Sequence, residues 1–146
     1  MKSIPLNILL VDDEKDFAEM MSFRLEEKGH HVKLAFSGQE PLDTLADNHT
    51  DVVIIDIRMP GLDGIATLKE VKVRHPIVEV ILLTGYGAVD TAVEGMKAGA
   101  FDYLVKPPDH KELLAKLEAA GKRKMEHEER IRMAEAKLLT RRTGDI

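Results

Sequence analysis

The 146-residue sequence predicts an α/β fold, in which helices cover both faces of one parallel β-sheet. Apolar runs rich in Val, Ile and Leu alternate with amphipathic stretches of helical spacing, and the pattern gives five candidate strands. Runs that are apolar throughout are typical of strands buried on both faces, and their alternation with helices indicates βαβ units. Because such crossovers are right-handed, we expect a doubly wound, flavodoxin-like sheet of five parallel strands in the order 2-1-3-4-5, with five helices.

The expected elements follow in strict alternation along the chain. Gly29 ends the first helix, and a fifth helix begins after Asp109, an N-cap residue with Glu112 three positions later, as in a capping box. The strands are predicted at residues 6–11, 31–36, 51–56, 79–84 and 102–105, and the first four helices at 14–28, 38–47, 64–74 and 89–98.

The fifth helix has an apolar seam, spaced alternately by four and three residues, that continues towards the end of the chain. The two middle positions of this seam, Lys124 and His127, are polar, and Gly121 weakens the helix locally. We expect a folded domain over residues 1–121 and a helical tail or linker over 122–146. This tail either forms a modest coiled coil or frays.

The composition limits the function classes. No apolar run approaches the roughly 18 residues that span a bilayer, and the N-terminus does not resemble a signal peptide. The sequence has no cysteine, which excludes disulfides, thiolate metal sites and a cysteine nucleophile. These features suit a protein of the reducing cytoplasm that has no membrane partner.

The charge is divided unevenly along the chain. Residues 1–121 carry 13 Lys and Arg against 21 Asp and Glu, a net charge of −8, and residues 122–146 carry 8 against 5, a net charge of +3. The acidic domain argues against direct binding of nucleic acid, which depends on basic patches. In the tail, basic residues are interspersed with glutamates, which favours a solvated helix face.

Acidic residues stand at the C-terminal ends of two predicted strands: Asp12 and Asp13 follow the first, and Asp56 ends the third. Strand ends of this kind open into the functional crevice of an α/β sheet, so the three carboxylates are expected to converge. Two like charges about 4 Å apart repel by roughly 4 kcal/mol at an effective dielectric constant near 20, so the cluster needs a cation. Oxygen ligands with room for water and a phosphate favour Mg²⁺ over Ca²⁺.

Part of this cluster has an alternative explanation. Asp12 or Asp13 could simply cap the helix that follows, which is a frequent role of aspartate. No helix begins directly after Asp56, so capping does not explain that residue.

Two further polar residues end strands at the same expected edge. Lys106 closes the short fifth strand before two prolines, and Thr84 closes the fourth strand before Gly85. Alone, a lysine at a sheet edge is usually a solubility device, and a threonine there is commonplace. Together with Asp56 and Mg²⁺, an ammonium and a hydroxyl suit covalent phosphoryl capture, in which Asp56 attacks phosphorus. The sequence has no glycine-rich phosphate loop, so nucleotide binding is poorly supported.

About residues 5–121 resemble the receiver domain of bacterial two-component response regulators. The resemblance implies that Asp56 is the phospho-acceptor and takes its phosphoryl group from a phosphohistidine of a sensor histidine kinase. It also implies that Asp12, Asp13 and Asp56 bind Mg²⁺ together with the main-chain carbonyl of Arg58. The matching motifs are Val11-Asp12-Asp13-Glu14, Asp56-Ile57-Arg58-Met59-Pro60-Gly61-Leu62-Asp63-Gly64, Leu83-Thr84-Gly85-Tyr86-Gly87 and Tyr103-Leu104-Val105-Lys106-Pro107.

The resemblance implies a conformational switch as well. Thr84 and Lys106 contact the phosphoryl oxygens, and Tyr103 is the aromatic residue whose ring swings inward when Thr84 moves towards the phosphate. Phosphorylation then shifts the population between two packings. The surface of the fourth helix, fifth strand and fifth helix carries this change to a downstream output protein or domain. That surface and the C-terminal helix are both candidate homodimer contacts.

Residues 83–93 and 99–103 look most like receivers of sigma-54-dependent activators, which usually continue through a helical linker into an ATPase and a DNA-binding domain. Neither follows here, so a stand-alone receiver and a piece of a longer regulator both stay open.

Two other functions remain as alternatives to a phosphorylation switch without turnover on an external substrate. One is a Mg²⁺-dependent phosphatase or phosphotransferase with Asp56 as a transient nucleophile, but such enzymes generally need a second acid and a cap over the substrate, which the sequence does not show. The other is a scaffold that works through its tail independently of phosphorylation.

Overall fold

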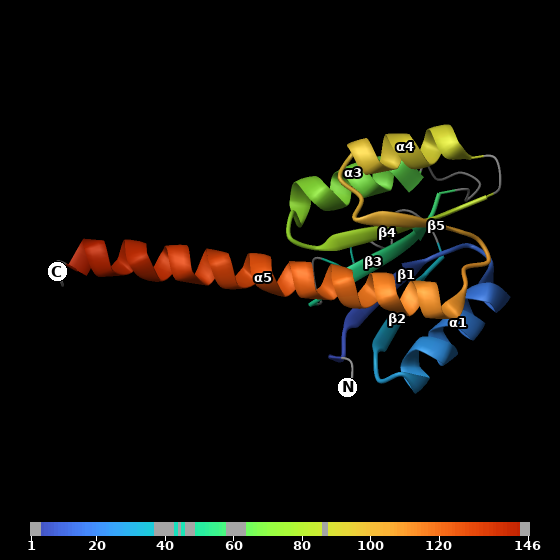
Figure 1. The fold of residues 1–146 in the computed structure, drawn as a ribbon, viewed down its shortest axis with the longest axis horizontal. Coiled ribbons are helices and arrows are strands. Elements are labelled where there is room, and N and C mark those ends of the chain that lie inside the picture. Colours follow the sequence, from blue (N-terminus) through green and yellow to red (C-terminus); the bar gives the residue numbers. More distant parts are fainter. Residues whose placement is uncertain are drawn as a thin grey trace.

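The computed structural model describes residues 4–36, 43, 45, 49–57, 64–85 and 88–143. The strands form one parallel five-stranded sheet in the order β2-β1-β3-β4-β5 (Figure 1), which confirms the predicted fold class and strand order. The predicted helix at 38–47 lies outside the described residues, apart from Asp43 and Leu45. The described elements are β1 (Asn7–Val11), α1 (Lys15–Glu27), β2 (His31–Ala35), β3 (Val52–Asp56), α3 (Gly64–Arg74), β4 (Glu79–Thr84), α4 (Val89–Lys97), β5 (Asp102–Val105) and α5 (His110–Thr143).

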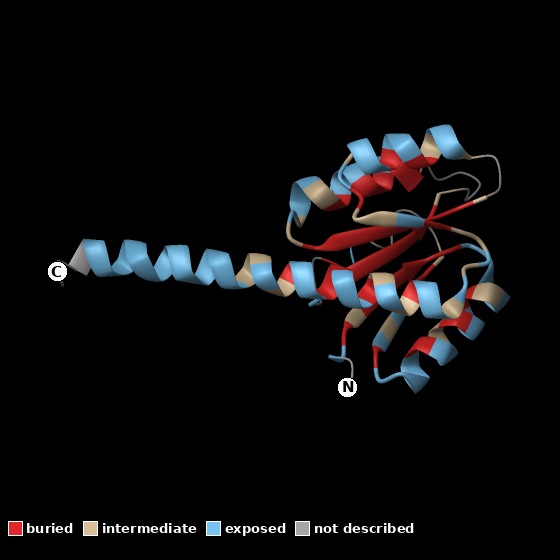
Figure 2. Cartoon of the chain, in the orientation of Figure 1, coloured by how far each residue is buried: buried red, intermediate tan, exposed pale blue. Residues whose placement is uncertain are grey.

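The sheet is covered on both faces, because its central strands are apolar on both sides. In β1, Ile8 and Leu10 belong to one core cluster, and the alternate residues Leu9 and Val11 belong to the other. Helices α1 and α5 pack on the first face, and α3 and α4 lie over the second (Figures 1 and 2). β3 and β4 are buried along their whole length, as expected for parallel strands between two helical layers.

Helix boundaries follow local sequence signals. Gly29 has a φ of 94°, a left-handed conformation that favours glycine, and α1 ends just before it, as predicted. At the start of α5, Asp109 Oδ2 accepts a hydrogen bond from the Glu112 backbone N–H at 3.3 Å, which confirms the predicted N-cap.

Helix α5 is continuous over 34 residues, and its second half projects away from the sheet (Figure 1). Of the residues assigned to the tail, 122–143 are helical. Gly121 does not interrupt the helix. A Cβ at this position would lie 2.6 Å from Leu6 Cδ2, so the glycine lets α5 approach the segment before β1 closely. No described helix is long and apolar enough to cross a membrane.

Candidate functional site

The carboxylates at the ends of β1 and β3 converge, as the sequence predicts. Val11 and Ile55 are partners in the sheet register, so Asp12, Asp13 and Asp56 follow at one edge. Each of the three aspartates offers a carboxylate oxygen, and these atoms all lie within 4.8 Å of one another. Asp12 and Asp56 are buried, whereas Asp13 is exposed. The cluster therefore opens to solvent on the side of Asp13.

Lys106 reaches this cluster from the end of β5. Its backbone N–H donates to the Thr84 carbonyl at 2.7 Å, and the peptide bond to Pro107 is cis. Its Nζ donates to Asp12 Oδ2 at 2.9 Å and to Asp56 Oδ2 at 3.0 Å. The predicted meeting of four side chains from three strand ends is thus present in the structure.

Two residues that the sequence analysis did not assign to the site also hold Lys106. Glu14 Oε1 accepts a hydrogen bond from Lys106 Nζ at 2.7 Å, and the ring centroid of Phe17 lies 4.4 Å from the same nitrogen. An ammonium has three N–H donors, and all three have carboxylate acceptors here. Glu14 and Phe17 are three residues apart at the start of α1, a spacing that places both on one face of a helix but does not show what that face contacts.

Burial and charge oppose each other in the site. Burial raises the pKa of the Asp12 carboxyl, against the opposing effect of its hydrogen bonds to Lys106 and to the Glu14 N–H. Burial alone would lower the pKa of Lys106, but hydrogen bonds to Glu14, Asp12 and Asp56 outweigh it and raise that pKa well above its ordinary value. The site contains one ammonium and four carboxyl groups, those of Asp12, Asp13, Glu14 and Asp56, so it can bind a further cation.

Thr84 lies beside this cluster at the end of β4. It is buried, and its Oγ1 donates to the Leu104 carbonyl at 3.4 Å. Tyr103, the proposed switch residue, lies on β5 with its side chain 41% exposed. Arg58, the fourth predicted metal ligand, lies outside the described residues.

The site residues line a hollow of about 550 Å³. Carboxylates, the Lys106 side chain and Thr84 all line it. Such a hollow can hold a divalent cation and a tetrahedral anion next to each other. Its lining consists of Asp13, Glu14, Phe17, Asp56, Thr84, Gly85, Lys106 and Pro107.

Comparisons with known proteins show what this chain is similar to. The chain is 44% identical to transcriptional regulatory protein ZraR of Escherichia coli K12 over 115 residues, which are 79% of this chain and 26% of ZraR. It is 46% identical to the regulatory protein AtoC of the same organism over 106 residues, 73% of this chain and 23% of AtoC. The receiver domain of the Francisella response regulator 1452 superposes with a TM-score of 0.74 at 36% identity, covering 81% of this chain and 98% of that domain.

The chain thus spans about a quarter of the length of the curated relatives it matches. Its residues 8–118 match the family described as response regulator receiver domain, and this matched region contains every strand end of the site. The chain therefore belongs to the response regulator receiver domain family.

Proposed function

We propose that this receiver accepts a phosphoryl group on Asp56 from a phosphohistidine of a sensor kinase and thereby controls an output protein or domain. The observation that carries the proposal is the position of Lys106 Nζ, 3.0 Å from Asp56 Oδ2 in a hollow that Asp13 and Thr84 also line. A nucleophilic carboxylate beside an ammonium suits phosphoryl transfer, in which positioning and charge neutralisation supply most of the catalysis.

The donor set of the cluster fits Mg²⁺. Three carboxylates within 4.8 Å of one another supply only oxygen, and the exposure of Asp13 leaves room for water and phosphate oxygens. Asp12, Asp13 and Asp56 are the proposed ligands, with the Arg58 carbonyl as a fourth. Bound there, Mg²⁺ would offset the negative charge of the transferred phosphoryl group.

The residues of the chain have separate roles in the transfer. An oxygen of Asp56 forms the new bond to phosphorus while the bond from phosphorus to the donor's imidazole nitrogen breaks, and the imidazole leaves. Lys106 binds a phosphoryl oxygen and keeps its hydrogen bond to Glu14. Of the three acids that bind Lys106, only Glu14 is neither the phospho-acceptor nor a proposed metal ligand. Thr84 Oγ1 exchanges its contact with the Leu104 carbonyl for the phosphoryl group.

This exchange is the proposed start of the switch. The 3.4 Å contact between Thr84 and Leu104 is long for a hydroxyl donor, so little stabilisation is lost when Thr84 turns towards a charged acceptor. Tyr103 is the neighbour of Leu104 and pairs with Leu82 of β4. Its ring, now partly exposed, then moves inward and changes the surface of α4, β5 and α5 that meets the output.

The proposal assigns no turnover on an external substrate, so the domain catalyses only its own phosphorylation and dephosphorylation. Incubation with acetyl phosphate and Mg²⁺ tests this assignment against the phosphatase alternative. Mass spectrometry should find one added phosphoryl group, and phosphate release should fall to the slow hydrolysis of this adduct while acetyl phosphate is still in excess. Continuous release at a high rate without a stable adduct contradicts the switch and supports a hydrolase.

The variant Asp13→Asn tests the assignment of the metal ligands, and Asp16→Asn is its matched control. Asp13 is a proposed metal ligand, and Asp16 is an exposed acid on the first turn of α1. We expect loss of phosphorylation in the first variant only. Equal phosphorylation of both variants contradicts the metal assignment.

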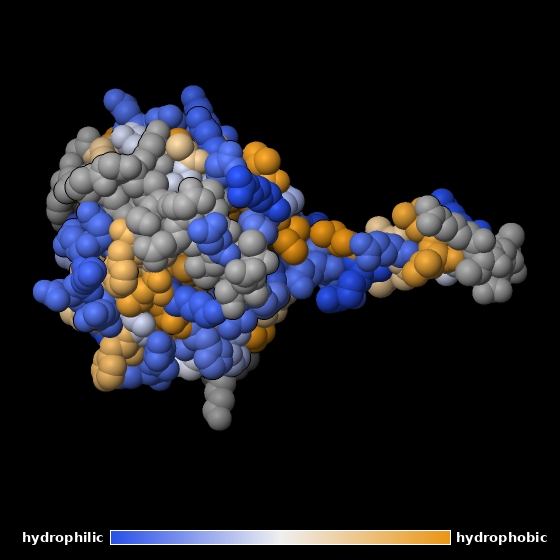
Figure 3. Space-filling model, turned by 180° about the vertical axis from the view of Figure 1, so that it is seen from behind, coloured by the Kyte–Doolittle hydropathy of each residue, from blue (hydrophilic) through white to orange (hydrophobic). Residues whose placement is uncertain are grey.

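We also propose that the projecting part of α5 pairs with a second copy of the chain. Apolar residues line it (Figure 3), and Ile131 and Leu138 of the predicted seam are 44% and 55% exposed. Arg130 flanks one side of the seam and Glu135 the other, so a parallel pair would bring these opposite charges together. Two heptads of contact are short, so the dimer should be weak and depend on concentration.

A further inference from the structure

Lys124 on α5 is buried, although it lies beyond residue 121, the predicted end of the domain. Its side chain is only 2% exposed, whereas its neighbours Lys122 and Arg123 are exposed. Lysine is almost never fully buried without a partner, because an unpaired ammonium loses its hydration. The burial of Lys124 therefore indicates a specific set of partners.

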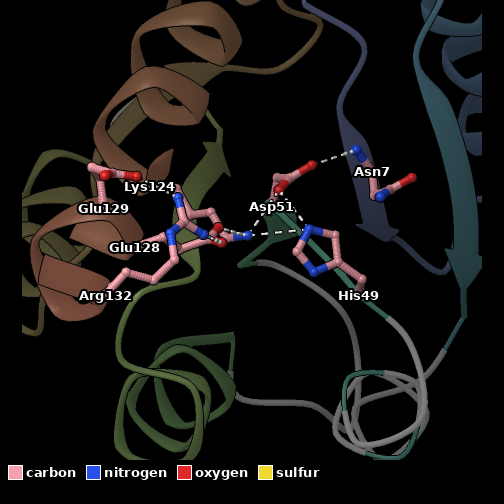
Figure 4. A network of polar contacts seen from close by, with 7 residues as sticks. All are labelled: Asn7, His49, Asp51, Lys124, Glu128, Glu129 and Arg132. Atoms are coloured by element: carbon pink, nitrogen blue, oxygen red, sulfur yellow. Dashed lines mark hydrogen bonds and ion pairs between the residues drawn. The ribbon is translucent and has the colours of Figure 1, made fainter. Parts of the chain in front are cut away.

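These partners are two carboxylates and an imidazole (Figure 4). Lys124 Nζ donates to Asp51 Oδ1 at 3.0 Å, forms an ion pair with Glu128 one turn later on α5, and lies 3.2 Å from His49 Nε2. We call Lys124, Asp51, Glu128 and His49 the Lys124 cluster. It lies at the start of β3, and Asp56 lies at the other end of that strand, so the cluster is separate from the phosphorylation site.

Asp51 connects the cluster to three strands. Its Oδ2 accepts a hydrogen bond from the Asn7 N–H at 2.8 Å, and its own N–H donates to the Asn7 carbonyl at 2.8 Å. Its carbonyl accepts a hydrogen bond from the Glu79 N–H at 3.2 Å. Asp51 is thus held between the starts of β1 and β4 at the entrance to β3. An ion pair to Asp51 fixes α5 to the sheet itself.

The cluster has the ligands of a cation site, and the Lys124 ammonium takes the place of the cation. His49, Asp51 and Glu128 offer ligand atoms within 4.8 Å of one another, the arrangement of a metal site. The ammonium of Lys124 contacts all three of these residues. A metal ion would have to displace this ammonium, so the observations favour an ion-pair anchor over a metal centre.

The ion-pair anchor also determines the direction in which the apolar seam of the tail faces. Lys124, Ile131 and Leu138 are seven residues apart, and an α-helix drifts by only about 20° in each heptad, so all three lie on nearly the same face. Beyond Glu128 every described side chain of α5 is exposed. Among the described residues, the Lys124 cluster is therefore the last part of α5 that contains a buried side chain.

We propose that Lys124 is the positioning residue of the tail. Its cluster makes residues 122–128 part of the folded domain, and it sets the direction in which Ile131 and Leu138 face. This positioning of the tail by Lys124 does not depend on phosphorylation of Asp56. It applies equally to any partner that binds the tail.

Native-state hydrogen exchange of the full chain tests the proposal, with Lys124→Met compared with Lys122→Met. Methionine keeps an unbranched side chain and removes the charge, and Lys122 is an exposed lysine two residues away on the same helix. In the wild type, amides of residues 122–128 should exchange more slowly than those of 132–141 by at least about tenfold. Lys124→Met should remove most of this difference, while Lys122→Met should keep it. Acetyl phosphate should label both variants like the wild type.

Two results would overturn the proposal. One is equal exchange of residues 122–128 and 132–141 in the wild type, which needs no variant. The other is the same exchange pattern in Lys124→Met and Lys122→Met.

A second variant covers the case in which Lys124→Met does not fold. Asp51→Asn combined with Lys124→Met removes both charges, and the Asn carbonyl oxygen can still accept from the Asn7 N–H. Because a buried charge without its partner is the main cost, the double variant should be more stable than Lys124→Met alone. A double variant whose destabilisation equals the sum of the two single effects contradicts the ion-pair anchor.

Discussion

At the scale of single residues, two lysines bound by carboxylates lie at opposite ends of β3. Lys106 is bonded to Asp12 and Asp56 at the C-terminal end, and Lys124 to Asp51 at the start. The first faces more acids than it can neutralise, which suits a site that takes up Mg²⁺. The second faces two carboxylates that α5 and the sheet supply, which suits a fixed contact.

Asp56→Asn should stabilise the protein in metal-free buffer. The substitution removes one of the like charges near Asp12 and keeps an oxygen that can accept from Lys106. We expect the free energy of unfolding to rise by on the order of 1 kcal/mol. Urea denaturation with and without millimolar Mg²⁺ measures this. Mg²⁺ should stabilise the wild type and affect the variant less. A less stable variant, or no effect of Mg²⁺ on the wild type, contradicts the account of the cluster.

His30 should make folding stability depend on pH. It is 2% exposed, its Nδ1 accepts a hydrogen bond from the Leu6 N–H at 3.1 Å, and the described residues give its Nε2 no partner. Burial, with a smaller contribution from His31, lowers the pKa of His30 below 6.5, and Glu118 opposes this shift. Below about pH 6.5 the unfolded chain therefore binds a proton before the folded chain does, and stability falls as the pH falls towards the folded pKa.

Urea denaturation between pH 5 and 8, a range chosen to bracket the ordinary histidine pKa of about 6.5, measures this slope. His30→Gln should reduce the dependence of the unfolding free energy on pH below about pH 6.5. His31→Gln, a substitution of the exposed neighbour, should leave this pH dependence unchanged. Equal slopes in the two variants contradict the assignment to His30.

How far the site could be predicted depended on how each residue is positioned. Asp12, Asp56 and Lys106 stand directly at strand ends, so the sheet order alone brings them together. Glu14 and Phe17 were missed because their contacts depend on how α1 leaves β1. Lys124 was interpreted as a polar interruption of an apolar seam, because no local pattern indicates that Asp51, 73 residues earlier, lies opposite it.

At the scale of elements, α5 combines two environments in one continuous helix. Up to Glu128 it packs on the sheet through Leu113, Leu117 and Ala120 and through the Lys124 cluster, and beyond that residue it is exposed. Periodicity predicted the helix but not this boundary, because the same seven-residue spacing continues across it. The domain boundary predicted at 121 stays a prediction, and Gly121, which was expected to weaken the helix, lies at a point of close packing.

Gly121→Ala should destabilise the protein although alanine favours helices. The gain in helix propensity is about 1 kcal/mol, and forcing a methyl group against buried Leu6 costs about 1–3 kcal/mol. We expect a net loss of about 1 kcal/mol, measured by urea denaturation. Leu6→Val in the same chain should recover part of it by making room for the methyl group. A more stable Gly121→Ala single variant contradicts the close approach of α5 to Leu6.

At the scale of the whole molecule, the two ends of the sheet have different tasks. The carboxyl ends of the strands bring together the residues that we propose for phosphoryl transfer, and an ion pair at the opposite strand ends attaches the helix that projects from the domain. The strand order and both helical layers could be predicted because the central strands β1, β3 and β4 are short, largely apolar runs separated by helical stretches. The helix predicted at 38–47 and the Arg58 carbonyl stay predictions, because both depend on segments outside the described residues.

Dimer formation through the tail should respond to substitutions on the seam alone. Ile131→Lys should shift the chain to monomer in sedimentation velocity over a range of concentrations, because it places a charge in the paired stripe. Met133→Lys is the matched control, since Met133 is 57% exposed but lies off the seam. Dissociation by both variants, or a wild type that is monomeric at every concentration, contradicts the tail dimer.

The most direct test of the central claim is to locate the phosphoryl group chemically. After reaction with acetyl phosphate and Mg²⁺, borohydride reduces an aspartyl phosphate to homoserine, and peptide mass spectrometry identifies the converted residue. The account predicts conversion at Asp56 alone, lost when Mg²⁺ is chelated and lost in Asp56→Asn. Conversion at another aspartate, or at none while the wild type remains folded, would contradict it.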